Sequence, residues 1–398
     1  MIKDALLALK KAERPVLIFG AGVRLAQAVD EARALALLLG IPVAVTWGAC
    51  DLFPADGSGR CVGGFGTHGT RAANFTVQNA DWIVAVGTRL DSKATGTPRA
   101  YFAREADIFM ADIDPAEVRK FGGVLGKTFT GVQADAKMFL GDMVSLARGE
   151  EWPGFDSWRR RCVEWMTFYP TCPQEYTRDG LVNPYALVQR LSEACRSNEV
   201  IVSDTGLSLA WLMQAFEFKD GQQFVHALNQ TPMGYGLPAA IGAAYARPGQ
   251  RVVLVTGDGG LMLNLQELSV VAGFNLPIKI ILFNNGGHVM CQQTQDQWLG
   301  GRYYSTSPEH GLCFPEFNVV ARAFGLRDAV AIYNQDVGPA LEWLFLTTED
   351  QPALLNVSIS GHHRLVPQVP YGRPNEDGNP LLPRDEFREQ MIVEVVDV

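Results

Sequence analysis

Residues 252–285 read VVLVTGDGGLMLNLQELSVVAGFNLPIKIILFNN, and this stretch decides the fold of the region around it. A run of β-branched and apolar residues leads into the glycines, and a second run, residues 278–283, leads into a pair of asparagines. Both runs predict buried parallel strands, and the segment between them has the apolar spacing of a helix. The carboxyl ends of such strands share one edge of the sheet, where ligands bind. We therefore expect Asp258 and Asn285 to lie close together at that edge.

Asp258 and Asn285 offer a carboxylate and a side-chain amide oxygen. Hard oxygen ligands of this kind suit Mg²⁺, which keeps coordination positions for substrate phosphates and water. A GDG turn or an NN pair on its own is usually structural, the first as a turn and the second as a cap at the end of a strand. Their occurrence in this order and at this spacing is much more specific. It predicts a metal and phosphate site.

The succession of strand, GDG, helix, strand and NN resembles the thiamine diphosphate (ThDP) motif of the acetolactate synthase and pyruvate decarboxylase superfamily. In that family an aspartate, an asparagine and a main-chain carbonyl two residues further on hold the metal ion. The resemblance therefore implies that Mg²⁺ is held here by Asp258, Asn285 and the main-chain oxygen of Gly287.

A second segment, residues 229–242, reads NQTPMGYGLPAAIG and resembles the same family nearly letter for letter. The resemblance implies that Met233 holds ThDP in a bent conformation and that Gly234 lies beside the cofactor. Small residues after Met233 allow a helix to approach the cofactor closely, and the free N–H groups of a helix start favour an anion. The alternative is that Met233 only fills the core.

Residues 203–211, SDTGLSLAW, align with the diphosphate loop of the family. Gly206 and Trp211 match the family pattern, but the two polar positions after the glycine are Leu207 and Ser208 here. The Ser208 hydroxyl and the backbone amides therefore remain as phosphate donors. Glycine-rich turns also supply backbone N–H groups to phosphates. The resemblance thus implies that the diphosphate group is bound by Gly206, Ser208, Gly259 and Gly260.

Residues 286–295, GGHVMCQQTQ, are expected to form a wall of the substrate pocket. His288 is a candidate for proton transfer because its unperturbed pKa lies near neutrality, and Gln292 is the second candidate catalytic residue. A lone histidine is more often only a hydrogen-bonding residue, and that alternative stays open. Acetolactate synthases carry a tryptophan in this region that selects the second keto acid, whereas this chain has Gln293 or Thr294. The 2-keto acid substrate therefore cannot be inherited from that enzyme.

The composition argues against several classes of protein. The chain has 398 residues and a net charge of −9 without a long basic block, which argues against nucleic-acid binding. It contains no apolar run of about 18 residues, so no membrane span is expected, and its N-terminus lacks the apolar core of a signal peptide. The seven cysteines are scattered without a CxxC pair, which fits reduced thiols and a cytoplasmic location rather than a zinc site.

Alternating strand and helix signals predict an α/β protein with two doubly wound parallel-sheet domains. We expect a central, Rossmann-like domain over 1–150, with a strand over 15–19, the turn Gly20-Ala21-Gly22 and a helix over 26–39. A connector over 151–182 and a diphosphate- and Mg²⁺-binding domain over 183–360 should follow, the latter opened by Asn183-Pro184 as the cap and first residue of a helix. The remaining residues, 361–398, are the C-terminal tail, either a lid or a packing segment.

The N-terminal domain resembles the central domain of the superfamily in several segments, among them 14–22 and 86–91. In acetolactate synthases that domain holds FAD, which does no redox work there. Gly20-Ala21-Gly22 lacks the third glycine of a full dinucleotide fingerprint. FAD is therefore an option, but a purely structural central domain is the expectation. The missing glycine, and the lack of an evident acidic ribose partner, also argue against a nicotinamide-dependent dehydrogenase.

Full-length members of the superfamily begin with a pyrimidine-binding domain, whose glutamate activates the cofactor. No glutamate of this chain sits in a matching motif, and Met1 falls where the linker to the central domain should start. We therefore expect a separate pyrimidine-domain subunit, in a hetero-oligomer such as a dimer of heterodimers. The resemblance then implies the large subunit of a ThDP- and Mg²⁺-dependent 2-keto acid decarboxylase or carboligase, a lyase or transferase. The alternatives are a non-catalytic ThDP-fold regulatory subunit and a truncated acetolactate synthase-like protein.

Overall fold

Two compact units make up the computed structural model, which describes residues 1–55, 58–227 and 229–396. One unit combines Met1–Pro170 with Val366–Val398, and the other spans Thr171–Leu365. Residues 397 and 398, at the end of the predicted tail, lie outside the described residues, as do 56, 57 and 228. Each unit holds a six-stranded sheet whose described strand pairs are all parallel. The predicted fold class, two doubly wound α/β domains, is confirmed.

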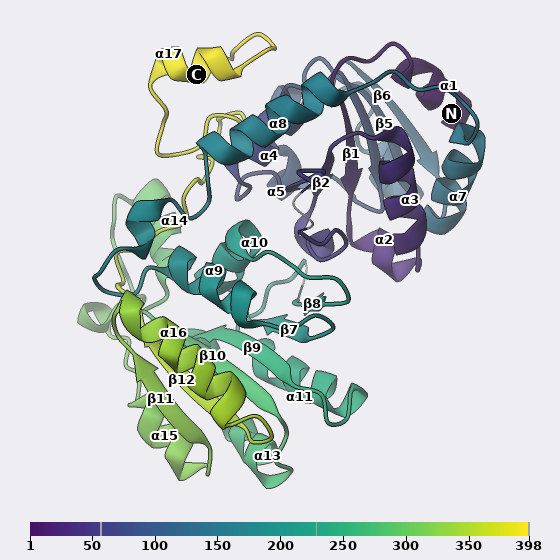
Figure 1. The fold of residues 1–398 in the computed structure, drawn as a ribbon. Helices are drawn as coiled ribbons and strands as arrows, with labels where there is room; N and C mark the ends of the chain where they lie inside the picture. Colours follow the sequence, from purple (N-terminus) through teal and green to yellow (C-terminus); the bar gives the residue numbers. More distant parts are fainter. Residues whose placement is uncertain (56–57, 228, 397–398) are drawn as a thin grey trace. The chain divides into compact units, whose positions relative to one another are not determined.

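The sheet of the first unit has the strand order β3-β2-β1-β4-β5-β6 (Figure 1). The strands are added outward from β1 to β3 on one side, and the chain then returns to add β4 to β6 on the other side of β1. Doubly wound folds bind ligands at such a switch point, here between β1 and β4. The strands are β1 (Pro15–Phe19), β2 (Val43–Val45), β3 (Cys61–Gly64), β4 (Trp82–Val86), β5 (Asp107–Asp112) and β6 (Thr128–Gln133). The α-helices are α1 (Ile2–Leu9), α2 (Ala21–Leu25), α3 (Val29–Leu39), α4 (Arg71–Gln78), α5 (Ser92–Thr95), α6 (Pro115–Arg119), α7 (Ala136–Ala147), α8 (Asp156–Phe168) and α17 (Arg384–Gln390).

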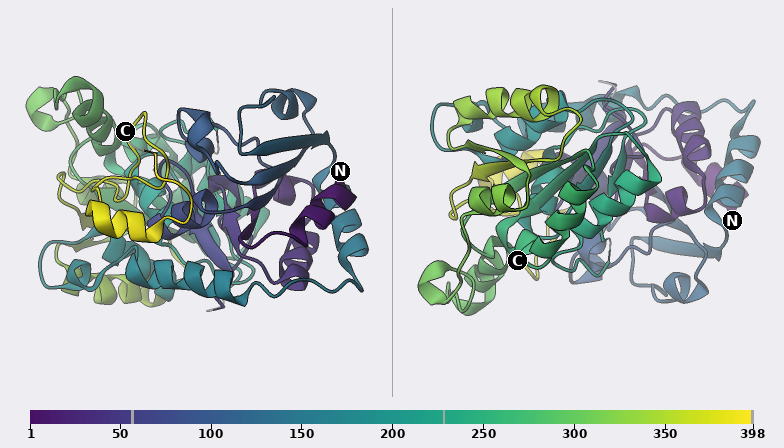
Figure 2. Two further views of the ribbon diagram at one scale, coloured as in Figure 1. Left: turned by 90° about the horizontal axis from the view of Figure 1, so that it is seen from above. Right: turned by 90° about the horizontal axis from the view of Figure 1, so that it is seen from below.

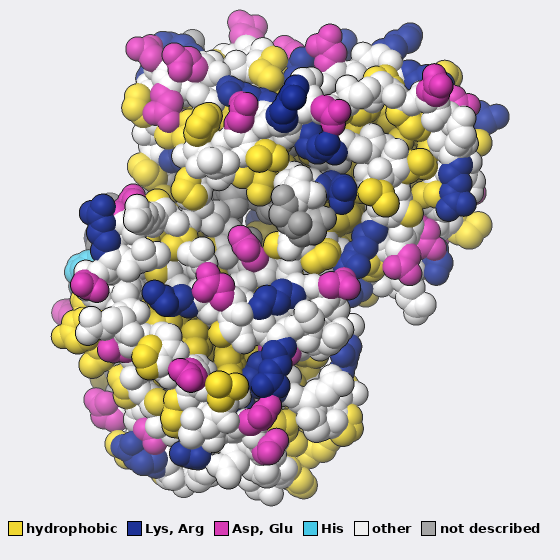
Figure 3. Space-filling model, in the orientation of Figure 1, with side chains coloured by type: hydrophobic (Ala, Val, Ile, Leu, Met, Phe, Trp, Pro, Cys, Tyr) yellow, Lys and Arg dark blue, Asp and Glu magenta, His cyan; other side chains and the backbone are white. Residues whose placement is uncertain are grey.

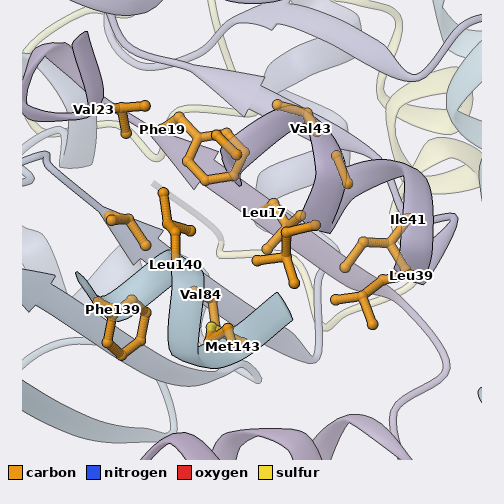
Figure 4. Close-up of a cluster of buried hydrophobic side chains, with 14 of the residues drawn as sticks. Leu17, Phe19, Val23, Leu39, Ile41, Val43, Val84, Phe139, Leu140 and Met143 are labelled. Atoms are coloured by element: carbon orange, nitrogen blue, oxygen red, sulfur yellow. The ribbon is translucent and has the colours of Figure 1, made fainter. Parts of the chain in front are cut away.

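Two hydrophobic cores cover the two faces of this sheet. Leu17 and Phe19 of β1 belong to one core, whereas Val16 and Ile18 of the same strand belong to the other. This alternation follows from the two-residue period of a β-strand. Figure 4 shows the first core, in which Leu140 of α7 lies among side chains of the sheet. Because both faces are buried, β1 reads in the sequence as a continuous apolar run.

The Gly20-Ala21-Gly22 turn contacts the turn that follows β4. The N–H of Gly22 donates to the oxygen of Gly87 at 2.9 Å, and a Cβ added to Gly22 would lie 2.7 Å from the Gly87 Cα. Close approach of the two backbones therefore requires glycine here. The helix predicted over 26–39 begins only at Val29, as α3, because Gln27 has a φ of 54°, which continues no right-handed helix. The short helix α2 precedes it, over Ala21–Leu25.

Residues 366–396, here called the C-terminal strap, pack on the first unit. The Asn375 side chain donates to the oxygen of Ala94 at 2.8 Å, and the backbone N–H of Ile392 donates to the Asn79 side chain at 2.7 Å. Helix α8, in the segment predicted as a connector, also belongs to this unit, since its two tryptophans are buried in one of the cores. The strap and α8 thus complete the first unit.

The sheet of the second unit has the strand order β11-β12-β10-β9-β7-β8, and helices cover both of its faces (Figures 1 and 2). The strands are β7 (Val200–Ser203), β8 (Gln223–Val225), β9 (Val252–Gly257), β10 (Ile278–Asn284), β11 (Arg327–Ala331) and β12 (Ala353–Ser358). The α-helices are α9 (Pro184–Ala194), α10 (Leu207–Ala215), α11 (Gly236–Ala246), α12 (Asp258–Met262), α13 (Leu268–Gly273), α14 (Val289–Leu299), α15 (Phe317–Ala323) and α16 (Asn334–Glu342).

Helix α9 begins as the sequence predicts. The Asn183 side chain accepts a hydrogen bond from the N–H of Tyr185 at 2.9 Å, and Pro184 is the first helical residue. Proline suits this position because its fixed φ is helical and its missing N–H would have no partner there. Both units also contain short helical turns. They are 3₁₀ turns at Trp47–Ala49, Arg99–Tyr101, Gln174–Thr177, Leu265–Glu267 and Pro308–His310, and a π-helical turn at Trp343–Thr347.

Charged side chains of both signs are interspersed over the face of the molecule drawn in Figure 3. Among the helices of the described residues, none is long and apolar enough to cross a membrane.

Candidate functional site

The candidate site lies at the carboxyl edge of the sheet in the second unit. β9 and β10 are neighbouring parallel strands, with Gly257 opposite Phe283 in the register. Asp258 follows β9 directly as the first residue of α12, and Asn285 follows β10. The backbone N–H of Asn285 donates to the Asp258 carboxylate at 3.0 Å. The expected closeness of these two residues is confirmed.

The Asp258 carboxylate is surrounded by backbone N–H groups. Its Oδ1 accepts from Gly259 at 2.6 Å. Its Oδ2 accepts from Asn285, from Gly286 at 2.7 Å and from Gly287 at 3.3 Å. The Asn285 side-chain oxygen in turn accepts from the N–H of Gly287 at 3.2 Å. The residues after β10 therefore wrap around a carboxylate that is only 2% exposed.

Two carboxylates are buried at this edge, Asp258 and Asp204. Burial raises the pKa of Asp258 to about 6, although the hydrogen bonds from the four backbone N–H groups lower it. Burial also raises the pKa of Asp204, again against the effect of its hydrogen bonds. Neither group is in a salt bridge within the described part of the chain. A buried carboxylate without a cation is costly, and a coordinated metal ion would favour the ionised form.

Gly206 and Ser208 lie on the loop after β7 and at the start of α10. β7 pairs with β9, so this loop reaches the same edge of the sheet. Gly206 has a φ of 111°, and a Cβ there would meet no atom within 4 Å. Ser208 is 4% exposed, and its Oγ has no hydrogen-bond partner among the residues that the structure describes. Buried hydroxyls are normally hydrogen-bonded, so this oxygen indicates a place where a polar ligand atom fits.

Met233 and His288 converge on Gly259. A Cβ added to Gly259 would overlap the His288 imidazole and would lie 2.9 Å from the terminal methyl of Met233. Only glycine fits this position in the present arrangement. The next residue, Gly260, is similarly restricted, since a Cβ there would lie 2.8 Å from a carboxylate oxygen of Asp204. Met233 itself is 37% exposed, more than a residue that merely fills a core.

His288 and Gln292 hold the segment after β10 to a later loop. The backbone N–H of His288 donates to the oxygen of Thr306 at 3.0 Å, and the Gln292 side chain donates to the same oxygen at 2.6 Å. Burial lowers the pKa of His288, so its imidazole is neutral near pH 7 and can accept a proton. Gln292 is 6% exposed, and its amide nitrogen is already used in the hydrogen bond to Thr306.

Two residues of this site were not found by sequence reasoning, Asp204 and Asn264. Asp204 follows β7 and accepts from the backbone N–H of Gly234 at 3.0 and 3.1 Å. The Asn264 side chain donates to the oxygen of Gly234 at 2.6 Å. Asp204 lies within residues 203–211, which align with the diphosphate loop of the family, and this is a weak signal. Asn264 gives none, because its partner is a backbone group 30 residues away.

No group of three or more histidine, cysteine, aspartate or glutamate side chains gathers as a metal site within the ranges that the structure describes. The ligands expected from the sequence, Asp258, Asn285 and the main-chain oxygen of Gly287, would form a different kind of donor set, with a single carboxylate. Such a set suits Mg²⁺, which binds through one or two carboxylates and completes its shell with substrate phosphates and water.

Comparison with known families identifies the class of protein that this fold and site define. Residues 2–143 match the model described as thiamine pyrophosphate enzyme, central domain, and residues 204–357 match thiamine pyrophosphate enzyme, C-terminal TPP binding domain. The second match begins at Asp204 and includes Asp258 and Asn285. The chain belongs to the thiamine diphosphate enzymes of the acetolactate synthase and pyruvate decarboxylase superfamily.

Within that superfamily the chain is similar to acetolactate synthases. It is 32% identical to the acetolactate synthase isozyme 2 large subunit of Escherichia coli over 376 residues, 94% of this chain and 65% of that protein. It is 31% identical to the probable acetolactate synthase large subunit of Methanocaldococcus jannaschii over 400 residues, 99% of this chain and 66% of that protein. Acetolactate synthase 1, chloroplastic, of Nicotiana tabacum is 31% identical over 371 residues, 92% of this chain and 54% of that protein. The chain thus spans just under two thirds, or less, of the length of these relatives.

Proposed function

We propose that this chain is the metal- and diphosphate-binding subunit of a ThDP- and Mg²⁺-dependent 2-keto acid decarboxylase or carboligase. The observation that carries the proposal is the buried Asp258 carboxylate at the end of β9, wrapped by the residues that follow β10. The relatives support it, because those compared above are named acetolactate synthases or probable acetolactate synthases.

The residues at this edge fit ThDP and Mg²⁺ in three respects. Two buried carboxylates lie here without a cationic partner among the described residues. The Ser208 hydroxyl is buried and has no hydrogen-bond partner in the described part of the chain. Gly206 leaves open space where a side chain would stand, and glycine-rich turns such as this one supply backbone N–H groups to phosphate. Each feature is explained if a divalent cation and a diphosphate group bind together.

In this proposal Mg²⁺ is held by Asp258, Asn285 and the main-chain oxygen of Gly287. The diphosphate group is held by Gly206, Ser208, Gly259 and Gly260, and the organic part of the cofactor lies beside Met233 and Gly234. When bound, ThDP supplies the nucleophilic carbon that attacks the keto group, which is chemistry that no side chain of the protein offers.

The chain's own part in the reaction is to orient, to exclude water and to move protons. His288 is neutral near pH 7 because burial lowers its pKa, so we propose it as a proton acceptor at the pocket wall. Gln292 is proposed to shape that wall, since its hydrogen bond to Thr306 fixes the loop behind His288.

We further propose that the activating glutamate comes from a separate pyrimidine-domain subunit in a cytoplasmic hetero-oligomer. The Escherichia coli relative is named a large subunit. The seven cysteines are free thiols, which fits a reducing compartment.

Turnover tests this partnership. The chain mixed with a polypeptide that carries a pyrimidine domain, encoded beside its gene, should consume a 2-keto acid when ThDP and Mg²⁺ are present. The chain alone should not. Turnover by the chain alone would refute the need for a partner. Cofactor binding without turnover in the mixture would favour a non-catalytic ThDP-fold subunit.

For the first unit we propose a structural role without FAD. Contact with Gly87 already explains why residues 20 and 22 of the Gly20-Ala21-Gly22 turn are glycines. The C-terminal strap also lies near the carboxyl end of this sheet, where the N–H of Val369 donates to the oxygen of Thr67 at 2.9 Å. The purified protein should show no visible flavin absorption. A stoichiometric flavin band would overturn this part of the proposal.

The metal site is tested by calorimetric titration of the chain with ThDP and Mg²⁺. Asp258→Asn keeps the size of the side chain but removes a charge, so Mg²⁺-dependent ThDP binding should be lost. Glu342→Gln, at an exposed position on α16, removes the same charge far along the chain from the site and should bind like the wild type. Equal affinity of Asp258→Asn and the wild type would refute the site.

A further inference from the structure

Gly234 is held through both of its backbone polar groups by two side chains. Its N–H donates to the two carboxylate oxygens of Asp204 at 3.0 and 3.1 Å. Its carbonyl oxygen accepts from the amide nitrogen of Asn264 at 2.6 Å. Gly234 has a φ of 85°, which other residues rarely adopt. Both hydrogen-bonding groups of this residue are thus committed, and the backbone directly after Met233 is fixed in place.

Asp204 links three segments of the site. Besides Gly234, its carboxylate accepts from the N–H of Thr205 at 2.7 Å and from that of Gly236 at 3.3 Å. It also accepts from the hydroxyl of Thr256 at 3.4 Å, near the end of β9. Asp204 is 1% exposed, and a buried carboxylate that accepts several hydrogen bonds is held firmly in one position. It therefore ties the end of β7 to the start of α11 and to β9.

Asn264 approaches Gly234 from the segment that begins with Asp258. The turn after α12 fixes it, since its N–H donates to the oxygen of Leu261 at 3.2 Å and its own oxygen accepts from Glu267 at 3.0 Å. A Cβ added to Gly234 would lie 2.8 Å from the Asn264 amide nitrogen and 2.9 Å from the Leu263 Cβ. The contact is too close for any residue but glycine.

Met233 is the residue whose position depends on this contact. It directly precedes Gly234, and its terminal methyl lies over Gly259 beside the His288 ring. Met233 is 37% exposed, so packing alone holds its side chain only in part. Its backbone, by contrast, is tied through the next peptide to Asp204 and Asn264. The side chain therefore projects from a fixed point.

We propose that Asp204 and Asn264 are positioning residues, which clamp the Gly234 peptide and so hold Met233 in place over Gly259. This inference rests on the proposed function, in which Met233 contacts the organic part of ThDP. Within the described part of the chain, the hydrogen bonds of Asn264 go only to Gly234 and to its own turn, and none goes to a residue proposed to hold Mg²⁺. Its loss should therefore weaken contact with the rings of the cofactor and leave the diphosphate end intact.

Two ligands distinguish this role from a general loss of structure. Mg²⁺–ThDP probes the whole site, whereas Mg²⁺–pyrophosphate probes only the metal and the diphosphate positions. In the purified full chain, Asn264→Ala should weaken Mg²⁺–ThDP binding about tenfold, the effect of roughly one lost hydrogen bond. Its affinity for Mg²⁺–pyrophosphate should stay within about twofold of the wild type. Asp204→Asn, which keeps one acceptor oxygen, should weaken Mg²⁺–ThDP binding as well.

Asn275→Ala is the matched control. Asn275 lies in the same unit, is exposed, and donates from its side chain to the oxygen of Asp350 at 3.1 Å. Its φ of 46° also makes alanine unfavourable there, so the variant loses stability without touching the site. It should bind both ligands like the wild type. If it also loses preference for ThDP over pyrophosphate, the effect of Asn264→Ala is general and the proposal fails.

A double-mutant cycle tests whether the clamp acts through Met233. In a Met233→Ala background, Asn264→Ala should change Mg²⁺–ThDP affinity by less than about twofold, because the side chain that it positions is gone. The proposal is overturned if Asn264→Ala binds Mg²⁺–ThDP like the wild type, if it loses both ligands equally, or if its effect is unchanged without the Met233 side chain. A wild-type chain that binds no ThDP would instead overturn the proposed function, and the clamp with it.

Discussion

Ser208 shows at the scale of one residue how a binding site departs from the rules of a stable interior. The residue is 4% exposed, and within the described ranges its hydroxyl has no hydrogen-bond partner. Leaving a buried hydroxyl unpaired costs about 1–3 kcal/mol. The folded chain carries this cost near the start of α10, next to a glycine at a φ of 111°. Such a local conflict with stability is expected at functional positions.

Ser208→Ala should therefore separate affinity from stability. Removing the unpaired hydroxyl should raise the free energy of unfolding by up to about 1 kcal/mol, because no buried polar group is left unsatisfied. The same change should weaken Mg²⁺–ThDP binding about tenfold, because one hydrogen bond to a charged phosphate is lost. Urea unfolding and calorimetric titration measure the two effects.

Ser192 offers a control for that experiment with the same exposure, 4%. Its hydroxyl is fully engaged, since it donates to the oxygen of Glu217 at 2.7 Å and accepts from the N–H of Glu217 at 3.1 Å. Ser192→Ala should lower the free energy of unfolding by about 1 kcal/mol and leave cofactor binding unchanged. If the two variants behave alike, the unpaired hydroxyl of Ser208 has no special role.

At the scale of elements, the C-terminal strap is held to the first unit by buried charge. Glu376 lies inside the strap with its side chain fully buried, 2.7 Å from the guanidinium of Arg104, and it also accepts from Gln78 of α4. Asp377, next to it, forms ion pairs with Arg373 and Arg384 of the strap itself. Paired carboxylates thus hold the middle of the strap, whereas Phe387 further along it packs into one of the cores of the first unit.

Glu376→Ala should loosen the strap, because it leaves the Arg104 cation without its partner. Removing one member of a buried ion pair costs about 3–5 kcal/mol. The strap should then be cut faster by added protease, while Mg²⁺–ThDP binding in the other unit is unchanged. Glu389→Ala, at an exposed position on α17, is the control and should resist the protease like the wild type. Equal cleavage of the two variants would show that Glu376 does not hold the strap.

The elements also show what the sequence could predict and what it could not. β1, β7, β9 and β10 are visible because their apolar runs are buried on both faces. β6 could not be predicted in this way, because its side chains are exposed or half-buried throughout. β3 could not be predicted either, because two of its four residues are glycines. A strand that buries little carries no hydrophobic pattern. Sheet pairing alone places these two strands.

In the candidate site, too, some residues could be predicted from the sequence and others could not. Asp258 and Asn285 could be paired from sequence, because each ends a visible strand and the two strands are adjacent along the chain order. The clamp on Gly234 could not, because Asp204 and Asn264 bond to backbone atoms that lie 30 residues away in either direction. Backbone groups are the same in every residue, so only the folded structure identifies such partners.

At the scale of the whole molecule, every residue proposed to bind the cofactor lies in one unit. They fall within Thr171–Leu365, whereas the first unit has its own sheet and its own two cores. A ligand stabilises only the part of a protein that it binds in the folded state. Mg²⁺–ThDP should therefore stabilise the second unit by about 2.7 kcal/mol at a concentration of about 100 times the dissociation constant.

Scanning calorimetry of the full chain should then show two transitions, of which only one moves when the cofactor is added. For a unit of this size the shift should be about 5–10 °C, and removal of Mg²⁺ by a chelator should reverse it. Asp258→Asn should show both transitions and no shift. The result with Asp258→Asn assigns the moving transition, because Asp258 lies in the second unit. A joint shift of both transitions would show that the two units unfold as one cooperative body, and the cofactor would then stabilise the whole chain.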